Sequence, residues 1–114
     1  MDCKKITPEI SVAGQLRPQD VPQAHAMGFR SLICNRPDGE ESNQPLFEDI
    51  ERAAEISGMK AYDIPVSGGG VTEAHVKALA EIWDDLPKPV LLYCRSGARS
   101  ATLVNAVLKA KRAG

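Results

Sequence analysis

The chain lacks an excess of charge of either sign. Its 114 residues carry 14 basic and 15 acidic side chains, so the formal net charge is −1. Proteins that bind nucleic acid or anionic membranes gather Lys and Arg on one surface. The balanced composition therefore argues against nucleic acid and membrane lipid as partners, and any recognition of an anion has to be local.

Long hydrophobic runs are absent as well. No apolar stretch approaches the ~20 residues that a membrane-spanning helix needs, and the opening MDCKKITPEI contains no apolar core of a secretory signal. Cysteines are few and odd in number: Cys3, Cys34 and Cys94. Such a set does not make a disulfide framework. We therefore expect a cytoplasmic protein with a single domain over residues 1–114.

Patterns of metal ligands are also missing. The two histidines, His25 and His75, fall in separate predicted helices without the spacing of a ligand pair. We expect neither a metal nor another cofactor. Cys34 lies in the apolar run SLIC and is expected in the core, with a resolving thiol as the alternative.

The sequence does contain an alternation of apolar runs and helical patterns. Strands are predicted over 9–16, 29–35, 59–66 and 87–94. Helices are predicted over 18–27, 45–57, 72–84 and from residue 100 onward. This alternation with short connectors is typical of a mainly parallel sheet flanked by helices. We predict an α/β fold with four or five strands, whose functional residues lie at the carboxyl ends of the strands.

The strand predicted at 87–94 ends at Cys94, and the loop RSGAR follows before the last helix. Successive N–H groups in such a turn, together with a helix N-terminus, form a nest for an anion. The same groups and the neighbouring arginines are expected to lower the pKa of the Cys94 thiol and make it a permanent nucleophile. A buried structural cysteine is the simpler alternative, and catalysis requires that the thiol reach solvent.

The candidate site residues follow from this loop. Cys94 and Arg99 are predicted to be catalytic, because a guanidinium binds an oxyanion through two N–H groups beside the thiolate. The candidate anion contacts are Arg95, Ser96, Gly97, Ala98 and Ser100.

A second polar loop, NRPDGEE at residues 35–41, follows the strand predicted at 29–35. Arg36 at its start is a further candidate anion contact, although a solvated loop charge is the simpler interpretation. The acidic residues Asp38, Glu40 and Glu41 are interpreted as a polar turn.

The segment YCRSGARS resembles the active-site loop of rhodanese-type sulfurtransferases and, less closely, the phosphate loop of cysteine-dependent phosphatases. Through SVAGQL, NRPDGEE, IPVSGGGVT and YCRSGARS, nearly the whole chain is similar to the phosphatase-like domain of the beta-lactamase hydrolase-like proteins. The resemblance implies a dual-specificity-phosphatase fold. It also suggests that Ser100 hydrogen-bonds the sulfur of Cys94, while the N-cap of the last helix is the other role considered for Ser100.

Two features of the sequence bear on which reaction the resemblance implies. Phosphatases of this type place five residues between the cysteine and the arginine, whereas four residues separate Cys94 from Arg99, as in rhodaneses. Phosphatases also need a general acid, and small residues (SGGG, 67–70) stand where it is expected after the strand ending in IPV. Candidate substitutes for the acid are Asp38, Asp63 and Glu73.

On these grounds we favour a sulfurtransferase that carries sulfane sulfur as a persulfide on Cys94. Its partners are then a small anionic sulfur donor and a thiol acceptor protein. The first alternative is a phosphatase that acts on a phosphorylated substrate through a phosphocysteine. The second is a binding domain that senses anions without catalysis.

Overall fold

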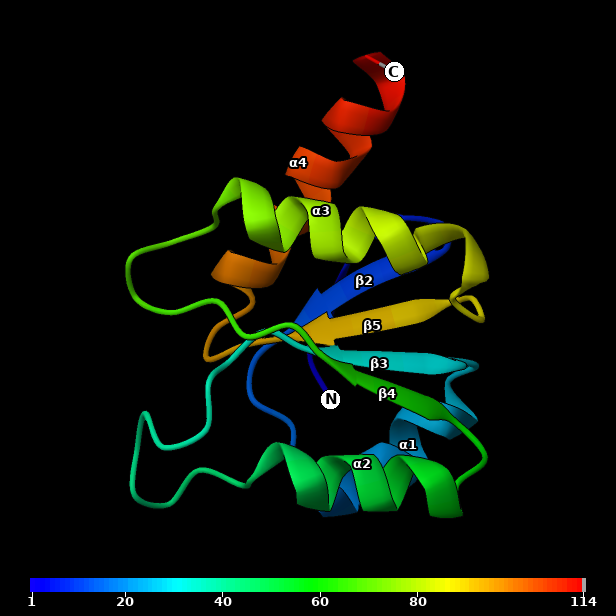
Figure 1. Cartoon of the computed structure of the whole chain (residues 1–114). Coiled ribbons are helices and arrows are strands. Elements are labelled where there is room, and N and C mark those ends of the chain that lie inside the picture. The colour runs from blue at the N-terminus through cyan, green and yellow to red at the C-terminus, as the bar shows by residue number, and fades with distance from the viewer. Residues whose placement is uncertain (114) are drawn as a thin grey trace.

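Five strands form a single sheet between two layers of helices (Figure 1). The computed structural model describes residues 1–113. The strands are β1 (Cys3–Thr7), β2 (Ile10–Ala13), β3 (Ser31–Cys34), β4 (Lys60–Asp63) and β5 (Val90–Tyr93). Their order across the sheet is β1-β2-β5-β3-β4, with β1 antiparallel to β2 and the other pairs parallel. The predicted α/β fold with a mainly parallel sheet is confirmed.

The helices divide between the two faces of the sheet (Figure 1). On one face lie α1 (Val21–Ala26) and α2 (Phe47–Ile56), and on the other lie α3 (Glu73–Ile82) and α4 (Ala98–Ala113). The short 3-10 segments η1 (Pro18–Asp20) and η2 (Trp83–Asp85) adjoin α1 and α3. None of the helices in the described part of the chain combines the length and the apolar composition that a membrane span requires.

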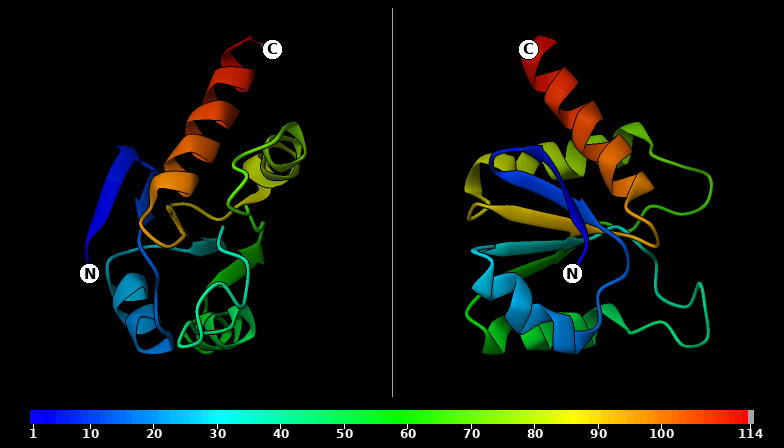
Figure 2. Two further views of the ribbon diagram at one scale, coloured as in Figure 1. Left: turned by 90° about the vertical axis from the view of Figure 1, so that its left-hand side faces the viewer. Right: turned by 180° about the vertical axis from the view of Figure 1, so that it is seen from behind.

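Both faces of the central strands are buried, as the two layers in Figure 2 require. In β5, Val90 and Leu92 belong to the core beneath α3 and α4, whereas Leu91 and Tyr93 belong to the core beneath α1 and α2. A parallel sheet covered on both sides needs such continuous apolar strands. This is why β3 and β5 stand out in the sequence as unbroken apolar runs.

Strand β1 was not predicted. Its sequence, CKKIT, pairs with β2 at the edge of the sheet and exposes Lys4 and Lys5. Lysines on an edge strand discourage pairing with another chain. They also remove the apolar alternation by which a strand is recognised, so only the pairing with β2 makes this segment a strand.

The last helix begins at Ala98 and not at Ser100. Gly97 precedes it with a φ of +95°, which turns the chain directly into the first helical turn. Ser100 lies inside that turn and is fully buried. The alternative role of Ser100 as the N-cap is therefore wrong.

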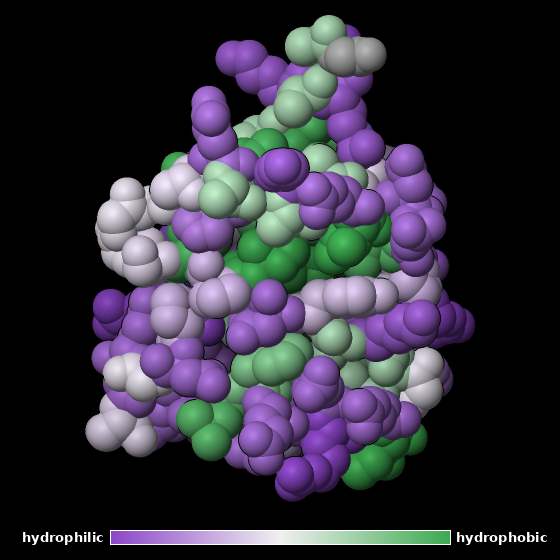
Figure 3. All heavy atoms as spheres, in the orientation of Figure 1, coloured by the Kyte–Doolittle hydropathy of each residue, from purple (hydrophilic) through white to green (hydrophobic). Residues whose placement is uncertain are grey.

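The loops after β2, β3, β4 and β5 gather at one end of the molecule, on the left in Figure 1. Parallel strands bring their carboxyl ends to one edge of the sheet, so the connecting loops have to meet there. Residues at this end are mostly hydrophilic or weakly polar, whereas a strip of hydrophobic residues shows between α3 and β4 (Figure 3). The loop that holds Cys94 is part of the polar end.

Candidate active site

Cys94 follows β5 directly, and its thiol lies at the base of the loop at residues 95–97. The N–H of Gly97 donates a hydrogen bond of 3.1 Å to its sulfur. The N–H of Ser100, one of the donors that the first turn of a helix leaves without a helical partner, also points to the sulfur. The thiol therefore sits where the loop and the start of α4 concentrate backbone donors.

These donors set the ionisation of the thiol. Burial raises the pKa of Cys94, whereas hydrogen bonds from the N–H groups of Ser100, Ser96 and Gly97 lower it. The lowering effects together outweigh burial, so the pKa lies below that of a free thiol. Both the backbone and the neighbouring arginines were expected to lower this pKa. In the structure backbone hydrogen bonds make the largest stabilising contributions, and the arginines are paired with carboxylates.

The loop packs closely against the end of β2. Gln15 donates its N–H to the carbonyl of Arg95 at 3.3 Å. A Cβ on Gly97 would lie 3.4 Å from the carbonyl oxygen of Ala13, and its φ of +95° is one that side chains disfavour. Glycine at position 97 thus permits both the turn and the close contact with β2.

Asn35 is a site residue that the sequence argument missed. Its Nδ2 donates to the carbonyl of Ile64 at 2.9 Å, and its Oδ1 accepts the hydroxyl of Ser100 at 2.8 Å. The side chain thus joins the ends of β3 and β4 to the first turn of α4, and both Asn35 and Ser100 are fully buried. The sequence feature that could have indicated this role is the position of Asn35, a polar residue directly after the apolar strand β3.

The Ser100 hydroxyl carries one proton, and the 2.8 Å hydrogen bond directs it to Asn35. It is not donated to Cys94 at the same time. Backbone N–H groups, including that of Ser100 itself, therefore stabilise the thiolate more than the hydroxyl does.

Arg99 lies in the first turn of α4 and is held by two other loops. Its Nη1 donates to Oε2 of Glu40 at 2.8 Å and to the carbonyl of Val66 at 2.7 Å, while Nη2 donates to Oε1 of Glu40 at 2.9 Å. Hydrogen bonds with Glu40 raise the pKa of Arg99, and the nearby charge of Cys94 adds to this. The bidentate geometry is the one that a guanidinium offers to an oxyanion.

Arg36 is buried, with 4% of its surface exposed. It donates to Glu40 at 2.8 Å, to Glu41 at 2.7 Å and to the side chain of Gln15 at 3.1 Å. The simpler interpretation of Arg36 as a solvated loop charge is wrong. The acidic residues do lie in an exposed polar turn, as predicted, and Glu40 and Glu41 in addition pair with arginines.

Glu40 connects the guanidinium group of Arg36, which is buried, with that of Arg99, which is partly buried. Hydrogen bonding from Arg99 lowers the pKa of Glu40 most, burial opposes this, and hydrogen bonding from Arg36 lowers it again, to about 2. The carboxylate is therefore ionised at neutral pH.

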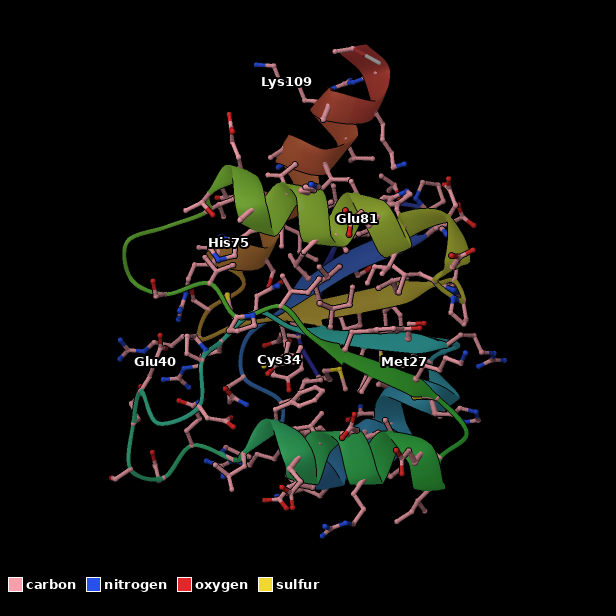
Figure 4. All side chains as sticks on the ribbon, in the orientation of Figure 1. Met27, Cys34, Glu40, His75, Glu81 and Lys109 are labelled. Atoms are coloured by element: carbon pink, nitrogen blue, oxygen red, sulfur yellow. The ribbon has the colours of Figure 1, made fainter. Side chains whose placement is uncertain are left out.

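A cavity of about 540 Å³ forms the mouth of the site. Arg95 at its edge is 71% exposed and pairs with Glu41 at 3.2 Å. Figure 4 places Glu40 at this end of the molecule, on the loop that joins β3 to α2. We define the mouth by its lining residues, which are Arg36, Glu40, Glu41, Gly68, Arg95 and Arg99.

The three carboxylates suggested as general acids do not line the mouth. Asp38 accepts the N–H of Phe47 at 2.9 Å and so closes the start of α2. Asp63 ends β4, and burial raises its pKa, with the charge of Asp38 adding to the effect. Glu73 is the first residue of α3. The structure thus brings Cys94, Arg99, Arg95 and Arg36 together at one end, and none of the three suggested acids lines the mouth that the arginines line.

The remaining cysteine of interest, Cys34, belongs to the core. It is 3% exposed, and burial raises its pKa to about 11. The prediction of a core cysteine is confirmed.

Residues 2–111 match the family described as "Beta-lactamase hydrolase-like protein, phosphatase-like domain". The chain belongs to this family. A beta-lactamase hydrolase-like protein from Agrobacterium fabrum is 39% identical over 103 residues, which cover 90% of this chain and 24% of the relative. The phosphatase-like domain thus spans about a quarter of the length of the curated relatives that it matches.

Solved structures of phosphatases have the same fold as this phosphatase-like domain. A candidate phosphatase from Neisseria meningitidis is 32% identical with a TM-score of 0.79, covering 87% of this chain and 70% of its own. The core catalytic domain of a PP-IP phosphatase from S. cerevisiae is 20% identical with a TM-score of 0.71, covering 94% and 64%. At that lower identity the second likeness shows the fold alone.

The favoured sulfurtransferase interpretation is therefore wrong. The family and the 32% identical structure are phosphatase-like, and nothing in these likenesses supports a rhodanese loop, a persulfide, a sulfur donor or a thiol acceptor. The four-residue spacing misled because the anion nest consists of backbone donors, which serve a phosphoryl group as well as a persulfide. Since α4 begins at Ala98, Arg99 lies in the first turn beside the thiol even with the shorter spacing.

Proposed function

We propose that this domain is a cysteine-dependent phosphatase that hydrolyses phosphate monoesters through Cys94. The observation that carries the proposal is the Cys94 thiol, 3.1 Å from the N–H of Gly97 and beside Arg99, in a member of a phosphatase-like family. A thiolate held by convergent N–H groups is a nucleophile adjacent to an oxyanion site.

In the first step the thiolate of Cys94 forms a bond to phosphorus while the bond from phosphorus to the leaving oxygen breaks. The leaving oxygen then takes a proton from solvent water. A water molecule next attacks the phosphocysteine and gives up a proton to solvent, the S–P bond breaks, and inorganic phosphate leaves with the thiolate restored. Arg99 and the backbone N–H groups of the loop stabilise the phosphoryl oxygens in both steps.

The other anion contacts of this proposal take supporting roles. The backbone of Ser96, Gly97, Ala98 and Ser100 supplies donors, and Arg36 and Arg95 contribute positive charge at the mouth. None of the three suggested acids lines the mouth. The preferred substrates are therefore aryl phosphates, whose leaving oxygen needs little protonation, over alkyl phosphates.

The test is hydrolysis of para-nitrophenyl phosphate by the whole chain and by Cys94→Ser. Because the serine hydroxyl stays protonated at neutral pH, we expect turnover to fall by about a thousandfold or more. Cys3→Ser is the matched control, since Cys3 lies in the edge strand β1, and it is expected to keep wild-type activity.

Mass spectrometry of acid-quenched reactions provides a second readout. It is expected to find one phosphoryl group on Cys94 in the wild-type chain and in Cys3→Ser. Equal turnover of Cys94→Ser and wild type, or a phosphoryl group on another residue, contradicts the proposal.

A further inference from the structure

The thiol of Cys94 is closed to solvent in this structure. The residue is 1% exposed and does not line the mouth. A thiol that attacks a substrate has to be accessible to it, and the thiol of Cys94 is not accessible in this conformation. Some part of the surrounding structure therefore has to move before phosphorus reaches the sulfur.

The Glu40 carboxylate engages two of the groups that an incoming oxyanion needs. It accepts two hydrogen bonds from Arg99, at 2.8 and 2.9 Å, and one from Arg36 at 2.8 Å. Glu41 likewise pairs with Arg36 and with Arg95. Every arginine that lines the mouth is thus already paired with a carboxylate of the chain itself.

The segment that carries Glu40 is tied to the site by charge and not by apolar packing. Residues 38–43, DGEESN, contain no hydrophobic side chain, and all six are exposed. Local segments without buried apolar contacts open at a low cost in free energy. The ion pairs of Glu40 and Glu41 are the contacts through which this segment reaches the mouth.

We propose that Glu40 is an internal competitor for the oxyanion site: its carboxylate closes the mouth over Cys94, and a phosphate ion or ester binds only when the 38–43 segment swings away. An anion can then bind only to the fraction of molecules in which the 38–43 segment is open. Its apparent dissociation constant equals the intrinsic constant divided by that fraction. The same factor applies to every oxyanion, because the cost of displacing Glu40 does not depend on the ligand.

This inference deepens the proposed function, since it concerns the same site, but it rests on anion binding and access to the thiol. The test therefore measures no turnover. Phosphate and tungstate binding are measured by calorimetry, and alkylation of Cys94 by neutral iodoacetamide is followed by peptide mass spectrometry, in wild type and in Glu40→Gln. A chain without phosphatase activity still passes or fails this test.

In Glu40→Gln we expect both anions to bind about tenfold more tightly, by a common factor, and Cys94 to be alkylated about tenfold faster. The matched control is Glu48→Gln, which removes a glutamate paired with Arg52 at 3.4 Å on the surface of α2, away from the mouth. It is expected to match wild type in both measurements.

If Glu40 serves only to hold Arg99 in place, the Glu40→Gln substitution frees Arg99. Anion binding then weakens and the rate of Cys94 alkylation stays the same. Weaker anion binding or an unchanged alkylation rate overturns the proposal. Should Glu40→Gln fail to fold, wild-type protein in increasing sodium chloride provides the second measurement. Screening of the ion pairs is then expected to speed alkylation of Cys94 by iodoacetamide, and an unchanged rate overturns the proposal.

Discussion

At the scale of single residues, the thiol of Cys94 illustrates how backbone donors outweigh burial. Removing a thiolate from water disfavours its charge, and Cys94 is almost fully buried. Three N–H groups from one loop and one helical turn reverse this effect. Cys34, which is buried among apolar side chains, keeps the expected rise in its pKa to about 11.

This contrast predicts a measurable titration. Because the folded state favours the thiolate, the pKa of Cys94 lies below that of a free cysteine, and the thiolate persists as the pH falls below that ordinary value. The difference in ultraviolet thiolate absorbance between wild type and Cys94→Ser, followed against pH, reports this group alone. A midpoint at or above that of a free cysteine contradicts the assignment.

At the scale of elements, the junction between β5 and α4 depends on one glycine. Gly97 has a φ of +95° and lies against the backbone at the end of β2. The turn sets where α4 begins, and this start sets which N–H groups face the sulfur. A local change at position 97 therefore alters both the stability of the fold and the donor nest.

Gly97→Ala is expected to destabilise the fold by about 1–3 kcal/mol, because alanine is strained at this φ. Urea unfolding monitored by circular dichroism measures the loss. Gly69→Ala is the matched control, since nothing lies within 4 Å of its added Cβ and its φ is unstrained. Similar stability of the two variants argues against strain at position 97.

At the scale of the whole molecule, the chain of ion pairs at the mouth joins loops from distant parts of the sequence. Arg36, Glu40 and Glu41 follow β3, whereas Arg95 and Arg99 follow β5. These contacts exist only in the folded chain. Their loss in acid therefore contributes to the pH dependence of stability.

The sign of this dependence follows from Glu40. Its pKa is about 2 in the folded chain and about 4.5 without these contacts. The contribution is complete above about pH 4.5 and is lost as the pH falls towards 2. Urea unfolding between these values is expected to show a steeper loss of stability in wild type than in Glu40→Gln. Parallel curves contradict this role of the ion pairs.

Local patterns in the sequence were enough to predict the class of the fold and the place of Cys94 within it. Apolar runs long enough to be buried on both faces mark β3 and β5, and a cysteine directly after such a run has to lie at the carboxyl edge of the sheet. These conclusions rest on local patterns, which a single segment carries without reference to the rest of the chain.

The surroundings of Cys94, in contrast, depend on contacts between distant parts of the folded chain. Strand β1 depends on its partner β2, and Asn35 acquires its role from Ile64 and Ser100. The pairing of Arg99 with Glu40 joins residues 59 positions apart. Charged loop residues carry no periodic pattern that predicts which of them meet. Their partners follow from the parallel order of the strands, which brings separate loops to one end of the molecule.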